Sequence, residues 1–300
     1  MTTSSVVTRD DRDRRRSASV KSGRATPLLP TAILLVGAVY CLIPVLWVVV
    51  ASTKGPDELF TTFTLAPSFT GGFWDNITDL LAFRDGIFWR WVANTVLYAG
   101  VGTVLSVAIS ALAGYALAKF RFRGREMVFR LILAGVLIPQ ITLAIPQYLL
   151  LSKVDLVGTY WSVLLPNLIS PFGIYLCRIF ATAAIPDDML AAGRVDGAGE
   201  YRLFWHIGLP PMLPGLVTVF LLQFIAIWNN FLLPFIMLSD DDYYPLTVGL
   251  YALLNQGTSQ PVLYTLVVAG SLLSIVPLIV LFLLLQRYWR LDVLSGGLKA

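Results

Sequence analysis

The sequence predicts an all-α polytopic membrane protein with six transmembrane helices. Hydrophobic residues make up 57% of its 300 residues, charged residues only 13%, and the mean hydropathy is +0.74. Soluble chains are typically about 45–50% apolar and about 25% charged. The apolar residues also lie in long stretches without Asp, Glu, Lys or Arg, at 25–53, 91–118, 131–152, 156–177, 203–239 and 243–286. A helix needs about 20 apolar residues to cross the hydrocarbon core, and each stretch is long enough.

Each uncharged stretch is expected to hold one span. The first four predict helices at about 29–51, 91–117, 130–151 and 159–180. In the fifth, a cluster of prolines begins the helix and Asp240 follows its end, which predicts 209–237. In the sixth, the turn-forming residues 255–261 precede a last helix at 262–286.

The distribution of basic residues predicts the orientation. With the N-terminus inside, the inner segments hold 18 of the 22 Lys and Arg residues, and the outer segments hold four. Cytoplasmic loops carry such an excess in membrane proteins, so both termini are expected to be cytoplasmic. Residues 1–25 predict a disordered basic tail, 26–90 the first span and an outer loop, 91–290 a membrane core, and 291–300 a cytoplasmic tail.

Several classes of protein are excluded by these patterns. The net charge of +4 follows membrane topology and does not indicate a nucleic-acid partner, and two cysteines in different apolar stretches form neither a disulfide framework nor a metal-binding pattern. The uncharged stretches predict spans without the ionisable residues that mark proton relays. The chain has no phosphate-binding loop and no set of metal ligands, so we expect no cofactor, no metal and no catalytic site. Uphill transport would therefore need a partner that supplies energy.

The segment 186–210, between the fourth and fifth spans, is the most informative one. Pro186 and two aspartates suit the first turn of a helix, and Asp196-Gly197 suits its end. Small residues at 191–193 would let a partner surface come close, which is typical of a docking element. The alternative from these residues alone is an interfacial helix that lies on the membrane.

This segment resembles the EAA loop of bacterial ABC importer permeases, E-A-A-x3-G-x9-I-x-L-P. Ala191, Ala192 and Gly193 stand at its first three positions, Gly197 at its glycine, and Ile207-Gly208-Leu209-Pro210 at its end. Asp196 precedes the glycine, as in many sugar permeases. Ala191 stands where the motif has glutamate and Gly193 where it has its second alanine, which puts one polar contact with the ATPase in doubt.

Other stretches extend the resemblance over about 30–300. They are Trp91–Thr95, Ala113–Arg125, Trp228–Phe231 and the tail from Ser295. The carbohydrate branch, of the maltose type, fits best. The resemblance implies a type I importer bundle in the cell membrane, with the coupling residues Ala191, Ala192, Gly193, Asp196 and Gly197. It also implies three protein partners: a second homologous permease, an ATPase dimer, and an extracytoplasmic binding protein that delivers sugar.

Neutral polar side chains in the spans suggest a neutral polar substrate, because sugars offer hydroxyl groups and apolar faces. The candidates for the substrate pathway are Asn94, Asn167, Gln223, Trp228, Asn229 and Asn230. The alternative is that these side chains bond to or pack against neighbouring helices. Eight aromatic residues in the outer loop 52–90 predict a membrane-surface belt or a contact with the binding protein.

Two other functions compete with an importer subunit. A facilitator or secondary carrier that works alone predicts internal repeats and ionisable residues at the midplane, and the sequence has neither. A membrane-embedded enzyme or assembly factor predicts paired catalytic residues within one span, which are also missing. The 186–210 segment favours the importer subunit.

Overall fold

A computed structural model describes residues 28–70 and 72–288, and the regular elements in these residues are all helices. Helix α2 (Leu28–Ala51) crosses the division between two compact units, the first of which ends at Trp47. It is long and apolar enough to cross a membrane and contains Pro44. The first predicted helix, 29–51, is therefore confirmed. The tails predicted at 1–25 and 291–300 lie outside the described residues.

The second unit begins with helices that the sequence analysis left inside an outer loop. These are α3 (Glu58–Thr61) and α4 (Gly72–Ala82). Positive φ angles at Arg84, Asp85 and Gly86 separate α4 from α5 (Ile87–Val96). Helix α5 then continues through a π-helical turn at Leu97–Val101 into α6 (Gly102–Lys119). The span predicted at 91–117 is helical throughout, and its helix begins one turn earlier.

The next three predicted helices are each broken in the structure. The helix predicted at 130–151 is two helices, α7 (Arg125–Leu137) and α8 (Gln140–Ser152), which are bent by 104°. Ile138 is extended because the following proline disfavours helical geometry. The helix predicted at 159–180 is α9 (Tyr160–Leu168) and α10 (Pro171–Ala184). The helix predicted at 209–237 is α13 (Leu209–Trp228) and α14 (Leu232–Met237).

The number of candidate spans follows from these breaks. Five helical stretches are long and apolar enough to cross a membrane, and there are six if the bent pair α7 and α8 forms one span. The last is α16 (Val262–Leu285), as predicted. The chain is thus an all-α polytopic membrane protein. A further helix, α15 (Leu246–Gln256), precedes the predicted turn and was not predicted.

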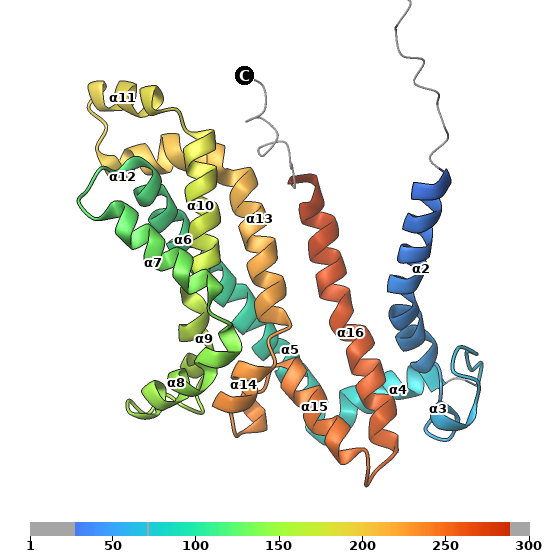
Figure 1. The fold of residues 1–300 in the computed structure, drawn as a ribbon. Helices are drawn as coiled ribbons and strands as arrows, with labels where there is room; N and C mark the ends of the chain where they lie inside the picture. Colours follow the sequence, from blue (N-terminus) through green and yellow to red (C-terminus); the bar gives the residue numbers. More distant parts are fainter. Residues whose placement is uncertain (1–27, 71, 289–300) are drawn as a thin grey trace, which may run out of the picture. The chain divides into compact units, whose positions relative to one another are not determined.

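Two short helices lie between α10 and α13. They are α11 (Asp187–Val195) and α12 (Glu200–Leu203), and α12 leads through the π-helical turn Phe204–Gly208 into α13. Figure 1 shows α11 and α12 at one end of α10 and α13, with α14 and α15 at the opposite end.

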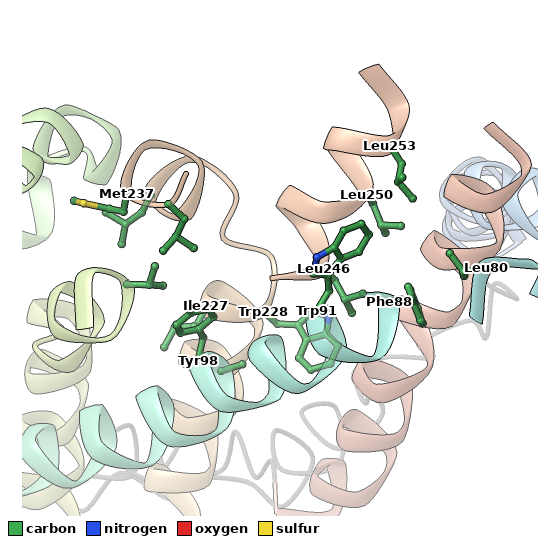
Figure 2. Close-up of a cluster of buried hydrophobic side chains, with 14 of the residues drawn as sticks. Leu80, Phe88, Trp91, Tyr98, Ile227, Trp228, Met237, Leu246, Leu250 and Leu253 are labelled. Atoms are coloured by element: carbon green, nitrogen blue, oxygen red, sulfur yellow. The ribbon is translucent and has the colours of Figure 1, made fainter. Parts of the chain in front are cut away.

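Two clusters of buried side chains stabilise the second unit. One cluster joins α5, α13, α14, α15 and α16, and Figure 2 shows Trp91 and Phe88 of α5 beside Leu246 and Leu250 of α15. The other joins α6, α10, α11 and α13 around Tyr115, Cys177 and Met212. The clusters lie toward opposite ends of α13, so the two ends of the helical unit each have a packed core.

Candidate functional site

The 186–210 loop contains a helix that ends in a tight, hydrogen-bonded turn. Helix α11 occupies Asp187–Val195, as the sequence predicts. Gly197 has φ +80, its amide donates to Arg194 O at 3.1 Å, and the amide of Ala198 donates to Gly193 O at 3.0 Å. These two bonds form a Schellman motif, in which a glycine takes a left-handed conformation that other residues rarely adopt.

Helix α11 has a buried face and an exposed face. Leu190 and Gly193 are buried, and a Cβ atom at Gly193 would lie 2.6 Å from Leu203 Cδ2 and 2.8 Å from Ile207 Cδ1. Gly193 therefore makes room for residues of its own chain. Ala191 and Ala192 are exposed. The two alanines are therefore accessible for the predicted contact with a partner, whereas the space beside Gly193 is filled by Leu203 and Ile207 of the same chain.

Ion pairs hold both ends of α11. At its start, Lys119 Nζ lies 2.8 Å from Asp187 Oδ1 and donates to Ile185 O at 2.6 Å. The hydrogen bond from Lys119 holds the pKa of the Asp187 carboxyl below its usual value. Near its end, Arg194 donates two bonds to the Glu200 carboxylate, at 2.8 and 3.2 Å. A planar bidentate pair of this kind constrains the relative orientation of the two side chains in addition to bringing opposite charges together.

A cavity of about 480 Å³ lies where three of the predicted helices break. Its wall includes the residues at the breaks between α7 and α8, between α9 and α10, and between α13 and α14. Non-helical backbone at membrane depth is tolerated where it lines a cavity or is buried in protein. The neutral polar side chains in the wall are Gln140, Gln147, Asn167, Ser170, Asn229 and Asn230, and the wall has no Asp, Glu, Lys or Arg.

Three of the six predicted pathway residues come together in this cavity: Asn167, Asn229 and Asn230. The amide nitrogens of Asn167 and Asn229 donate to the backbone four residues earlier, at Val163 O and Ile225 O. Their side-chain oxygens accept no hydrogen bond from the described part of the chain. The sequence analysis missed Gln140 and Gln147, although each follows a proline in an apolar stretch, a signal that could have identified them.

The other three candidates lie elsewhere. Asn94 donates to Asp242 O at 2.8 Å and Tyr244 O at 3.0 Å, and it accepts from the Tyr160 hydroxyl at 3.1 Å. It thus fastens the loop between α14 and α15 to α5. Trp228 is buried, with its ring stacked on Phe224 at 5.4 Å. Gln223 is half-buried on α13 and does not line the cavity.

Further bonds tie the loop that Asn94 holds to α5 and to the residues just before and after it. Trp91 Nε1 donates to Asp241 O at 2.9 Å, and the Tyr98 hydroxyl donates to Tyr243 O at 3.0 Å. Arg84 pairs with the Asp241 carboxylate at 2.6 Å. The motif residues Trp91 and Asn94 therefore have a structural role, at the end of the helical unit opposite to α11.

One expectation about charge is wrong. Arg178 lies inside α10, and it already fell within the predicted span 159–180, so the spans are not free of ionisable residues. Its guanidinium is 2.9 Å from Glu126 Oε1 of α7 and 3.6 Å from the centre of the Phe129 ring. The uncharged stretch ended at residue 177, but the helix continues past it, because an arginine that is paired with a carboxylate is tolerated within a span.

The outer-loop aromatic residues do not share one environment. Phe69, Trp74, Phe63 and Trp89 are exposed, as a surface belt or a partner contact requires. Phe88 is buried in the core cluster of α5 and α15 and belongs to neither.

Comparison with known proteins places these features in a family. Residues 106–290 match the model of the family described as binding-protein-dependent transport system inner membrane component. An arabinooligosaccharides transport system permease protein of Halalkalibacterium halodurans is 38% identical over 214 residues, which cover 71% of this chain and 75% of the relative. A lactose transport system permease protein of Rhizobium radiobacter is 30% identical over 266 residues, covering 88% and 93%.

The fold also matches a solved structure. A chain in the crystal structure of a bacterial ABC transporter involved in the import of the acidic polysaccharide alginate superimposes with a TM-score of 0.76. The sequence identity is 23%, and the match covers 96% of this chain and all of the other. At this identity the likeness concerns the fold.

Proposed function

Because this chain belongs to the family of binding-protein-dependent transport system inner membrane components, and is an ABC importer permease, we propose that it passes a neutral sugar across the cytoplasmic membrane. The substrate class includes mono-, di- and oligosaccharides and related neutral polar solutes. The observation that carries this proposal is the cavity at the three helix breaks, whose polar side chains are amides and one hydroxyl.

The chemistry of the cavity wall favours neutral substrates over ionic ones. An amide offers both a donor and an acceptor, which suits the hydroxyl groups of a sugar. A phosphate or a carboxylate would need a cationic partner when it leaves water, and no Lys or Arg lines the cavity. Among the relatives is an sn-glycerol-3-phosphate transport system permease protein, so charge is a property that can separate members of this family.

The 186–210 loop supports a role in energy coupling. Helix α11 exposes Ala191 and Ala192, while Asp196 and Gly197 shape its end, with Gly193 packed beneath. We infer that this exposed face enters a groove on a separate ATPase subunit, and that hydrolysis occurs there, since the sequence of this chain contains no phosphate-binding loop. A second permease, an ATPase dimer and an extracytoplasmic binding protein complete the proposed complex, with the loop and both termini in the cytoplasm.

The proposal is tested with the complete transporter in liposomes, with its binding protein outside and ATP inside. The solutes are arabinotriose, lactose, diacetylchitobiose and glycerol 3-phosphate, chosen from the substrate names of relatives. We expect one or more neutral sugars to accumulate and glycerol 3-phosphate not to. Accumulation should need ATP and survive collapse of the proton gradient. Uptake of glycerol 3-phosphate alone, or sugar uptake without the ATPase, would overturn the proposal.

A further inference from the structure

Lys119 connects three helices through one ammonium group. It is the last residue of α6, and its side chain is only 6% exposed. The ammonium donates to the carbonyl of Ile185, just after the end of α10, and to the carboxylate of Asp187 in the first turn of α11. A cation favours the C-terminus of a helix and an anion the N-terminus. The group therefore satisfies the end of α10 and the start of α11 together.

Helices α6 and α10 approach each other closely at two glycines. A Cβ atom at Gly114 of α6 would lie 2.5 Å from Cys177 Cβ, and one at Gly173 of α10 would lie 2.7 Å from Ser110 Oγ. Small residues of this kind let helix backbones approach within a membrane. Because the pair is so closely packed, a displacement of its end would be transmitted to both helices.

The link between α10 and α11 contains only Ile185 and Pro186. Ile185 is buried, and its φ and ψ are −117° and 106°, so the chain changes direction there. Farther along, Leu190 and Gly193 hold α11 against Leu203 and the following turn. Lys119 is a side chain that bonds to both sides of this link, at the carbonyl of Ile185 and at the carboxylate of Asp187.

We propose that Lys119 is a positioning residue that fixes the angle between α11 and the closely packed helices α6 and α10, so that displacement of α11 is transmitted to the membrane helices. The inference rests on the proposed contact of α11 with an ATPase and adds the element that connects this contact to α6. Loss of the ammonium leaves α11 attached by its buried face but free to tilt about the Ile185–Pro186 link. Coupling should then weaken although the loop stays folded.

The test measures the angle directly in the assembled transporter. Nitroxide labels are placed at Leu112→Cys on α6 and Met189→Cys on α11, both at exposed positions, in a Cys41→Ser background because Cys41 is exposed. Pulsed EPR gives the distance distribution without nucleotide and with ATP and orthovanadate. The variants are Lys119→Met, which keeps the apolar stem, and Lys119→Arg, which keeps the charge. Lys153→Met is the matched control, since Lys153 is exposed and has no ion pair within the described residues.

We expect Lys119→Met to broaden the distance distribution. It should also reduce the stimulation of ATP hydrolysis by sugar-loaded binding protein by about fivefold or more, since fivefold is the lower end of the usual range of coupling between two sites. The probe is whichever of arabinotriose, lactose and diacetylchitobiose gives the highest uptake. Lys119→Arg should restore both quantities, and Lys153→Met should change neither. An unchanged distribution and unchanged stimulation in Lys119→Met, at normal membrane abundance, would overturn the inference.

A second variant separates this inference from the proposed function. Ala192→Arg adds a long charged side chain to the exposed face of α11 and should disrupt the ATPase contact. If Ala192→Arg abolishes stimulation and Lys119→Met does not, Lys119 has no positioning role, and the proposed function stands. If Ala192→Arg has no effect, the proposed ATPase contact of α11 is wrong. If Lys119→Met lowers only the abundance of the complex and leaves the distance distribution narrow, its role is structural and the inference is overturned.

Discussion

Gly193 of α11 packs against Leu203 of α12 with no space for a side chain between them: a Cβ atom on Gly193 would lie 2.6 Å from Leu203 Cδ2. The contact joins two helices that are separated by the turn at Gly197. It explains a glycine where the family motif has alanine, because the room is used inside the chain. The exposed surface of α11 is consequently provided by other residues, Ala191 and Ala192 among them.

Gly193→Val should therefore destabilise the 186–210 loop. Overpacking of a tight contact costs about 1–3 kcal/mol, because Leu203 and Ile207 must move to admit the new side chain. We expect faster proteolysis within the loop and a lower yield of assembled complex, measured by limited trypsin digestion and co-purification. Ala191→Val, on the exposed face, is the control and should leave the digestion rate unchanged. Equal digestion rates for the two variants would show that Gly193 is not packed as described.

Gly197→Val should weaken coupling by straining the turn that ends α11. A side chain at φ +80 costs about 1–2 kcal/mol, although a Cβ atom there would meet no other atom within 4 Å. Gly199→Val is the matched control, since Gly199 also has open space around it but has φ −70. Gly197→Asn should be tolerated better, because asparagine adopts the left-handed conformation more readily.

The measurement for these variants is ATP hydrolysis stimulated by sugar-loaded binding protein, normalised to membrane abundance. We expect the stimulated hydrolysis to be highest in the wild type and to decrease in the order Gly199→Val, Gly197→Asn and Gly197→Val. Asp196→Ala should have a smaller effect than Gly197→Val because it removes a side chain without adding strain. Normal stimulation in Gly197→Val would contradict the role assigned to this turn.

The sequence predicted the local structure of the loop because that structure depends on neighbours in the chain. Pro186 and Asp187 mark the start of α11, and Gly197 allows the left-handed turn at its end. By contrast, the packing of Gly193 depends on Leu203 and Ile207. Their distance from α11 is set by the path of the chain through the turn at Gly197 and through α12. Residue type and spacing indicate a small residue there but do not show which surface it faces.

The difference between structure set by neighbours in the chain and structure set by packing also explains which features of the membrane helices were predicted. Hydropathy identified the uncharged stretches, because crossing a membrane requires a run of apolar residues. It did not show the breaks at Pro139, Ser170 and Asn230, since an apolar stretch reads the same whether its helix is straight or interrupted. Prolines inside a span indicate a kink, and only the packing decides whether it becomes a break of 104°, as between α7 and α8.

The orientation of the chain remains a prediction from the 18 basic residues of the inner segments. Alkaline phosphatase, which is active only outside the cytoplasm, is fused after residue 70, 155 or 255, and separately after residue 125 or 195. We expect activity from the first three fusions and none from the other two, because Lys and Arg retain loops on the cytoplasmic side. β-Galactosidase fusions at the same sites should give the reverse pattern. Activity of the phosphatase at 125 or 195 would refute this topology.

Asn94→Ala should reduce stability without changing which sugar is transported. Asn94 is 4% exposed, and its amide donates to two backbone carbonyls of the loop at 242–244. An unsatisfied buried partner costs about 1–3 kcal/mol, so thermal unfolding of the purified complex should occur at a lower temperature. Asn255→Ala, at an exposed position, should have no such effect. A changed preference among the sugars at unchanged thermal stability would place Asn94 in the pathway instead.

Asn167→Ala and Asn230→Ala should weaken sugar transport with little effect on stability. Both residues line the cavity at the helix breaks, where the Asn167 side-chain oxygen has no partner within the described residues. Loss of one hydrogen bond to a sugar costs about 0.5–1.5 kcal/mol, which is about a twofold to twelvefold loss of affinity. Initial uptake rates at increasing concentrations of sugar-loaded binding protein measure this loss.

Gln223→Ala is the matched control for these two variants, because Gln223 is an amide on the adjoining helix α13 that does not line the cavity. Its uptake curve should coincide with that of the wild type. The comparison separates the two interpretations of polar residues in the spans. If all three alanine variants reduce uptake equally, the amides act through helix packing, and the cavity has no specific role in sugar passage. If only Asn167→Ala and Asn230→Ala reduce it, the broken helices provide part of the pathway, since their position in the cavity is what distinguishes them from Gln223.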